Sequence, residues 1–221
     1  MTPLPSSGAR VLLLVAHPDL RRSRVNRRLL DAARRLAGAR LELRDLYALY
    51  PDFAIDVEAE QAALKRADLI VWQHPLQWYS MPALMKLWLD EVLRYGWAYG
   101  RHGRALTGKD LWLLLSTGGS EAAFHPSGYN RRFIDAFLPP YEQTAAMCGL
   151  RFLPPLVLHD ALRIDDATLD AHVHTVTERL TSYPDWPELA DLARCDACEP
   201  PDADRPDDCA DAAAAPPEVH R

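Results

Sequence analysis

Three short stretches of polar and aromatic residues each follow an apolar run, and their residue types suit a planar ring that carries a phosphate. They are HPDLRRSRVN at residues 17–26, PLQWY at residues 75–79 and STGG at residues 116–119. Aromatic side chains offer flat apolar surfaces, and glycine allows a backbone amide to approach a ligand closely. If the apolar runs are neighbouring parallel strands, the three stretches meet at one edge of a sheet, where such sheets bind ligands.

The first loop, residues 17–26, has the features of a phosphate site. Ser23 can cap a helix, and the amides of Arg24, Val25 and Asn26 behind it would then point toward an anion. Ser23 could also be an ordinary cap, and the nearby arginines could be solvated, but the convergence of three loops favours phosphate. His17 is either a structural histidine or, from its place at the end of a strand, a ligand contact.

The second loop, residues 75–79, and the third loop, residues 116–119, would hold the ring itself. Trp78 and Tyr79 could instead only roof the core, and most Gly-Gly pairs are simple turns. Neither a G-x-G-x-x-G fingerprint nor a P-loop follows the first strand, so a dinucleotide-binding motif of that kind is absent from the sequence. The candidate ring contacts are Leu76, Gln77, Trp78, Tyr79, Ser116, Thr117, Gly118 and Gly119.

Apolar runs and segments of helical periodicity alternate along the chain. The expected strands cover residues 10–16, 40–46, 68–74, 110–116 and 151–158, and the expected helices cover residues 23–37, 58–67, 82–94, 134–148 and 166–182. Runs that are apolar throughout are typical of strands buried on both faces, and Pro75 is expected to end the third strand. The alternation predicts an α/β fold, with a doubly wound, five-stranded parallel sheet and helices on both faces.

Charge and composition divide the chain into a flexible leader (residues 1–9), one domain (residues 10–185) and an acidic tail rich in proline and alanine (residues 186–221). From Asp185 onward there are eleven acidic residues and three arginines, so the rest of the chain carries a net charge of about +2. A body of that charge, without a basic stripe, argues against nucleic-acid binding. No apolar run is long enough to span a membrane.

The tail contains the one cluster of residues that could bind a metal. Cys195, Cys198, Cys209 and His220 are possible zinc ligands, and the first pair has suitable spacing. The surrounding residues are mostly alanine, proline and aspartate, which cannot build a core around an ion. We therefore expect a disordered tail and no metal site. Cys148 alone in the domain gives no disulfide framework, which suits a reducing cytoplasm.

Four motifs give the chain a resemblance to the NAD(P)H:quinone oxidoreductases of the flavodoxin-like fold. They are AHPDLRRSRVN at residues 16–26, HPLQWYSMP at residues 74–82, GWAYG at residues 96–100 and STGG at residues 116–119. The run at residues 49–82 is especially similar to the ancillary flavoproteins of glutathione-regulated potassium efflux systems. The resemblance implies flavin contacts in all three loops, with FMN, or alternatively FAD, as the cofactor and NAD(P)H as co-substrate.

The resemblance also implies a homodimer, in which Tyr99 is presented to the flavin of the partner. After the third loop the sequence departs from the family pattern, because Phe124 stands near the position of a tyrosine that handles protons. His125 and Tyr129 are the local candidates for that role. Backbone amides of the second loop would serve the N5/O4 edge of the flavin, and those of Gly118 and Gly119 the N1/O2 edge.

Three functional interpretations follow from the residues and the resemblance. The first is a quinone reductase that transfers two electrons as hydride, in a ping-pong cycle, to a quinone or another small electrophilic acceptor. The second is a regulatory subunit of a membrane potassium efflux transporter, and the third is an electron carrier of the flavodoxin type. We expect a cytoplasmic protein, peripheral at the inner face of the cell membrane if it binds such a transporter.

Overall fold

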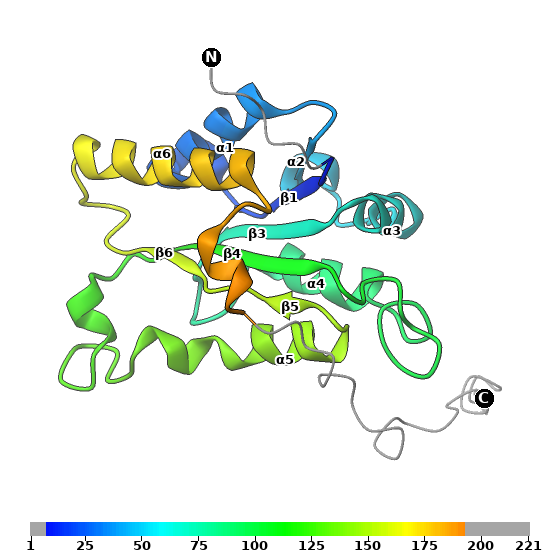
Figure 1. The fold of residues 1–221 in the computed structure, drawn as a ribbon. Helices are drawn as coiled ribbons and strands as arrows, with labels where there is room; N and C mark the ends of the chain where they lie inside the picture. Colours follow the sequence, from blue (N-terminus) through cyan, green and yellow to red (C-terminus); the bar gives the residue numbers. More distant parts are fainter. Residues whose placement is uncertain (1–7, 193–221) are drawn as a thin grey trace, which may run out of the picture.

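A parallel sheet forms the centre of the protein in its computed structural model, which describes residues 8–192. The four main strands are β1 (Val11–Val15), β2 (Leu41–Asp45), β3 (Leu69–Pro75) and β4 (Asp110–Ser116), and they lie in the order β2-β1-β3-β4. Every pairing is parallel (Figure 1). The predicted doubly wound α/β fold is confirmed.

The strand expected at residues 151–158 is two short strands, so the sheet has six strands within the described residues. β5 (Arg151–Phe152) and β6 (Leu156–Leu158) both pair with β4, one near its start and the other near its end. The two prolines at positions 154 and 155 lack amide hydrogens and interrupt the ladder between them. Leu158 therefore ends beside Ser116, which brings a fourth loop to the carboxyl edge.

Helices cover both faces of the sheet because the side chains of β1 alternate between two cores. Leu12 and Leu14 face the core that includes α2 (Leu46–Leu49), α3 (Val57–Arg66), α4 (Ala83–Val92) and α5 (Pro139–Met147). Val11 and Leu13 face α1 (Arg24–Leu36) and α6 (Asp166–Ser182) (Figure 1). Short 3-10 helices occupy Leu20–Arg22, Glu121–Phe124, Ile134–Phe137 and Pro187–Ala190 (η1 to η4).

Two local expectations need correction. Pro75 is the last residue of β3 and pairs with Ser116, whereas the sequence suggested that it would lie beyond the strand. Proline is tolerated there because the pairing of β1 with β3 has already ended at Gln73. The packed structure also continues past residue 185, since Trp186 is buried against Trp112 and Tyr183.

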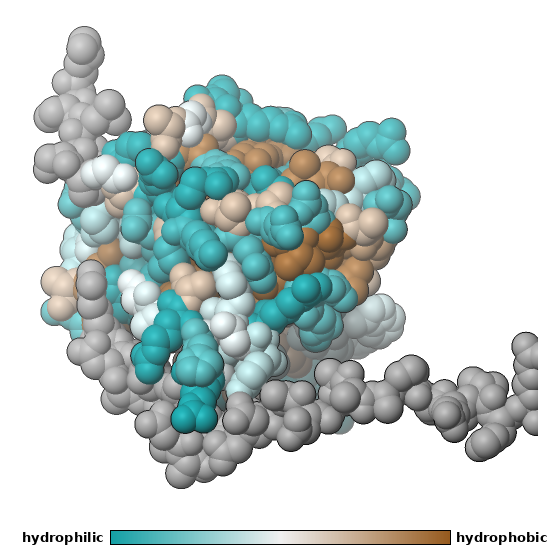
Figure 2. Space-filling model, turned by 90° about the vertical axis from the view of Figure 1, so that its right-hand side faces the viewer, coloured by the Kyte–Doolittle hydropathy of each residue, from teal (hydrophilic) through white to brown (hydrophobic). Residues whose placement is uncertain are grey.

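The leader (residues 1–7) and the tail from residue 193 onward lie outside the described residues, and so do Cys195, Cys198, Cys209 and His220. Within the described residues, no helix has the length and apolar character needed to cross a membrane. Figure 2 shows the side of the molecule where the strands begin. Polar side chains cover most of that face, with small groups of apolar residues between them.

A buried carboxylate joins three elements on the α3 side of the sheet. Glu60 on α3 is fully buried and accepts hydrogen bonds from Arg44 Nε (2.8 Å), Tyr50 Oη (2.5 Å) and Trp88 Nε1 (2.9 Å). A buried charge is tolerated when it is paired and its oxygens are hydrogen-bonded, as here. Glu60 therefore fixes α3 against β2 and α4.

We predict that Glu60→Ala lowers the free energy of unfolding by about 3 kcal/mol, because it leaves the Arg44 guanidinium and the Trp88 indole without their acceptor. Urea denaturation monitored by circular dichroism measures the change. Glu58→Ala, an exposed position on the same helix, is the matched control and should change stability by less than about 0.5 kcal/mol. Equal effects of the two substitutions would contradict the assignment.

Candidate functional site

Two adjoining cavities lie at the carboxyl edge of the sheet. The larger has a volume of about 530 Å³ and is lined by the first loop, by Pro75 and Leu76, by residues 116–118 and by Ala161 and Leu162. The smaller, of about 240 Å³, extends from Leu76 and Gly118 toward Trp78 and Tyr129. The larger volume is within the usual range for a small-molecule site. The three predicted loops therefore meet around one cleft.

The N-terminus of α1 opens into the larger cavity. Ser23 Oγ accepts the Asn26 amide hydrogen at 3.1 Å, so the predicted cap is present. The Arg24 side chain is held by Asp166 (2.7 Å) and by the Ile164 carbonyl oxygen, and only its backbone amide remains for a ligand. With no acidic residue in the first turn, the positive end of this helix is available to an anion.

Asn26 ties the first loop to the strands that carry the other two. Its side chain is buried and donates from Nδ2 to Ser116 Oγ (2.8 Å). Its backbone carbonyl oxygen accepts a hydrogen bond from Gln73 Nε2 (3.0 Å). Val25 lies beside it in the core and lines the same cavity. These bonds fix the start of α1 relative to the ends of β3 and β4.

The second loop is a tight turn with left-handed backbone at two residues. Gln77 and Ser80 exchange backbone hydrogen bonds of 2.9 and 3.0 Å, and φ is 47° at Trp78 and 64° at Tyr79. The Gln77 amide is thus used inside the turn, which corrects the expectation that it serves a ligand; only the Trp78 and Tyr79 amides remain for that role. The Trp78 side chain is 91% exposed beside the smaller cavity.

The third loop leaves room for a ligand at Gly118. A side-chain carbon built there would meet no protein atom within 4 Å, yet the residue lines both cavities. Packing within the protein therefore does not require glycine at this position. Ser116 and Thr117 are buried, and Thr117 Oγ1 donates to the Gly119 carbonyl oxygen (2.7 Å).

His17 lies at the rim of the larger cavity and is about half buried. Its Nδ1 accepts the Asp19 amide hydrogen at 3.1 Å, which leaves Nε2 as the protonated nitrogen of the neutral ring. Burial lowers the pKa of His17, although Asp19 and Asp45 act in the opposite direction. A neutral imidazole with a free N–H is thus available to a polar group of a ligand.

The three predicted catalytic residues lie in different places. Tyr99 lies in the connection between α4 and β4, at the opposite edge of the sheet from the cleft, and its ring contacts Tyr95 (Figure 1). Tyr129 is 87% exposed and lines the smaller cavity. His125 is not among the residues that line either cavity; its Nδ1 is 2.7 Å from Ser127 Oγ and its ring packs on Phe133.

A fourth loop, residues 159–162, also lies at this edge and was not predicted from the sequence. Ala161 and Leu162 line the larger cavity, and His159 contacts Thr117. Asn130, also missed, accepts a hydrogen bond from Tyr79 Oη (3.3 Å). The signal for the fourth loop was present, because it follows an apolar strand in the same way as the other three.

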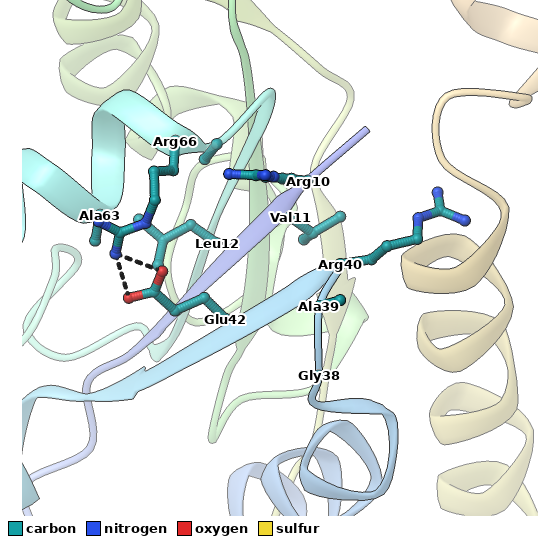
Figure 3. Close-up of a pocket in the computed structure, with 10 residues that line it drawn as sticks. Arg10, Val11, Leu12, Gly38, Ala39, Arg40, Glu42, Ala63 and Arg66 are labelled. Carbon is teal, nitrogen blue, oxygen red and sulfur yellow. Dashed lines mark hydrogen bonds and ion pairs between the residues drawn. The ribbon is translucent and has the colours of Figure 1, made fainter. Parts of the chain in front are cut away.

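A further cavity, of about 200 Å³, lies at the opposite edge, where β1 and β2 begin (Figure 3). Its guanidinium groups are largely engaged by the protein. Arg66 forms an ion pair with Glu42 (2.8 Å), and Arg40 points away and donates to the carbonyl oxygens of Ala9 and Tyr183. This cavity is remote from the cleft.

A family model described as the flavodoxin-like fold matches residues 9–180. The chain belongs to this family. This flavodoxin-like protein is 48% identical over 182 residues to the glutathione-regulated potassium-efflux system ancillary protein KefF of Enterobacter sp. (strain 638), an alignment that covers 80% of this chain and 97% of the relative. The resemblance to the ancillary flavoproteins is confirmed.

Two solved structures of the same fold are also similar. One is general stress protein 14 of Treponema denticola in complex with FMN, at 35% identity and a TM-score of 0.70, covering 83% of this chain and 99% of the other. The second is an NADPH-quinone reductase from P. pentosaceus, at 30% identity and a TM-score of 0.70, covering 78% and 98%.

We predict that Asn26→Ala lowers the free energy of unfolding by about 1–3 kcal/mol, because the buried Ser116 hydroxyl loses its donor. Denaturation of the protein without added ligand measures this effect separately from binding. Asn130→Ala, which removes an exposed amide contact with Tyr79, is the control and should stay within about 0.5 kcal/mol of the parent protein. A loss at Asn26 no larger than that of the control would contradict the joining role of Asn26.

Proposed function

We propose that this flavodoxin-like protein is an NAD(P)H:quinone oxidoreductase that binds FMN in the cleft at the carboxyl edge. The observation that carries the proposal is the convergence of a helix N-terminus, two turns with available backbone amides and an open glycine on two adjoining cavities. The FMN complex of a 35% identical neighbour favours FMN over FAD, and the NADPH-quinone reductase at 30% identity favours this reaction.

Each loop has a separate task in the proposed reaction. A bound flavin supplies hydride transfer from NAD(P)H to the quinone. The amides at the start of α1 hold the phosphate, and those of Trp78 and Tyr79 orient the ring. The amides of Gly118 and Gly119 stabilise negative charge at the opposite ring edge. If the two substrates used the same open face of the ring in turn, the reaction would follow ping-pong kinetics.

We further propose a homodimer in which Tyr99 faces the cleft of the second copy. Tyr99 lies at the opposite edge of the sheet from its own cleft, so it can act on a flavin only in another subunit. Tyr129 lines its own cleft and stays a candidate for contact with the substrate. His125 stays a weaker candidate, because its ring is directed to Ser127 and Phe133.

A second function is proposed alongside the first, as ancillary subunit of a potassium efflux transporter. The supporting observation is the 48% identity to KefF over nearly the whole length of that relative. In this role the protein would lie at the cytoplasmic face of the membrane through the transporter.

The purified protein should contain flavin and should oxidise NADPH when a benzoquinone is supplied. Gly118→Val should retain the fold and lose at least about tenfold in flavin affinity, because the new methyl groups enter the cleft. Gly38→Val is the matched control, as it also meets no protein atom but lies at the other edge. A colourless protein that takes up neither FMN nor FAD would contradict the proposed function.

The ancillary role has its own test, which does not depend on catalysis. Cells that express a glutathione-regulated transporter should show faster potassium efflux when this protein is co-expressed. Gly118→Val separates the two functions: full stimulation by this variant indicates docking without a need for flavin, and loss of stimulation indicates that flavin binding is required. No stimulation by the parent protein would contradict the ancillary role and leave the enzyme proposal standing.

A further inference from the structure

The third loop rests on the fourth through three backbone hydrogen bonds. The Thr117 amide donates a hydrogen bond to the Leu158 carbonyl oxygen, and the Ala161 amide donates one to the Thr117 carbonyl oxygen. The Asp160 amide donates to the Gly119 carbonyl oxygen, and each of the three distances is 2.9 Å. Asp160 adopts a left-handed backbone (φ 56°) in making this connection. The position of the Gly118 and Gly119 amides is therefore set by residues 158–161 as well as by β4.

One side chain completes this connection and its proton can be located by counting donors. Thr117 Oγ1 lies 2.7 Å from the Gly119 carbonyl oxygen and 3.0 Å from His159 Nδ1. A carbonyl oxygen only accepts, so the single hydroxyl hydrogen is directed to Gly119. His159 Nδ1 must then carry a proton and donate it to Thr117 Oγ1. The nitrogen of His159 that gains or loses a proton is therefore Nε2.

The surroundings of His159 favour the neutral imidazole, but they include one group that favours its protonation. The ring packs on Phe124, with centroids 5.3 Å apart. Partial burial lowers the pKa of His159, and the carboxylate of Glu121 on η2 acts in the opposite direction. The next residue, Asp160, is paired with Arg163 at 2.8 Å, and Thr117 on the other side is uncharged. An additional negative charge nearby would raise the pKa of His159.

We propose that His159 is a positioning residue that sets how strongly the third loop holds a negatively charged ring edge. Its Nδ1–H fixes Thr117, and protonation at Nε2 places a positive charge behind the Gly118 and Gly119 amides. The inference rests on the proposed function, because it takes those amides to face the flavin. His159 belongs to the fourth loop, whereas the sequence suggested His125 as the local histidine.

The sign of the effect follows from the charges. Protonated His159 favours the negatively charged form of the bound ring over the uncharged form. Reduction is therefore linked to the uptake of one proton from solvent at Nε2, in the pH range above the lowered pKa of the free protein. The midpoint potential of the bound flavin should rise more steeply as pH falls in that range than it does without the histidine.

The experiment compares His159→Asn with His159→Leu. The asparagine amide branches from Cγ as Nδ1 does, so it can donate to Thr117 but cannot titrate. We expect His159→Asn to retain flavin affinity and to lose the steep segment of the plot of potential against pH. His159→Leu should lose both, with flavin affinity weakened roughly fivefold for the missing hydrogen bond. His174→Asn, on an exposed part of α6, is the control and should behave as the parent protein.

A measurement on flavin-free protein tests the proton placement independently of activity. Nitrogen-15 NMR of the imidazole should show His159 protonated at Nδ1 above its pKa; protonation at Nε2 alone would overturn the inference. Identical profiles of potential against pH for His159→Asn and the parent protein would also overturn it, while leaving the quinone reductase proposal intact. Failure of the parent protein to bind flavin would instead remove the proposed function and this inference together.

Discussion

The buried amide of Asn26 is the contact on which the geometry of the cleft depends. Nearly all buried polar groups in proteins are hydrogen-bonded, because an unpaired one costs about 1–3 kcal/mol. Asn26 meets this requirement by donating to Ser116 and by accepting from Gln73 through its backbone. The residues that bind Asn26 belong to β4 and β3. These hydrogen bonds therefore fix the N-terminus of α1 relative to the two loops that follow those strands. A ligand that contacts all three encounters a site formed before it binds.

The sheet makes this junction possible by placing the three strands side by side in register. Gln73 on β3 is opposite Val15 on β1, and Pro75 is opposite Ser116 on β4. The hydrogen-bond ladder continues past the ends of the strands. The Ala16 amide donates to the Gln73 carbonyl oxygen, and the Leu76 amide donates to the Ser116 carbonyl oxygen. The loops consequently begin at nearly the same level. The site is an extension of the sheet rather than a separate structure.

The four main strands, the longer helices and the three loops could be predicted from the sequence because each depends on a local pattern. The short helix α2, the division of residues 151–158 into two strands and the separation of η3 from α5 were not predicted. Buried strands are apolar throughout, and Ser23 precedes a segment of helical periodicity. The hydrogen-bond partner of each individual N–H donor could not be predicted from the sequence. The Gln77 amide is taken by Ser80, and the guanidinium of Arg24 is held by Asp166, which lies 142 residues away in the chain. His159 was missed for a similar reason, since its contact with Thr117 exists only after β6 pairs with β4.

The two edges of the sheet differ in the way that a functional site requires. Among the described residues, all five non-glycine residues with positive φ lie in connections that follow the carboxyl end of a strand: Phe53, Trp78, Tyr79, Arg131 and Asp160. Such conformations cost about 1–3 kcal/mol each and persist where the surroundings hold them. The amino edge instead carries a satisfied cluster, in which Asp110 accepts from both Arg151 (2.7 Å) and Tyr183 (2.8 Å). Burial and pairing at that edge and in the core stabilise the fold, which allows the loops around the cleft to keep a strained shape.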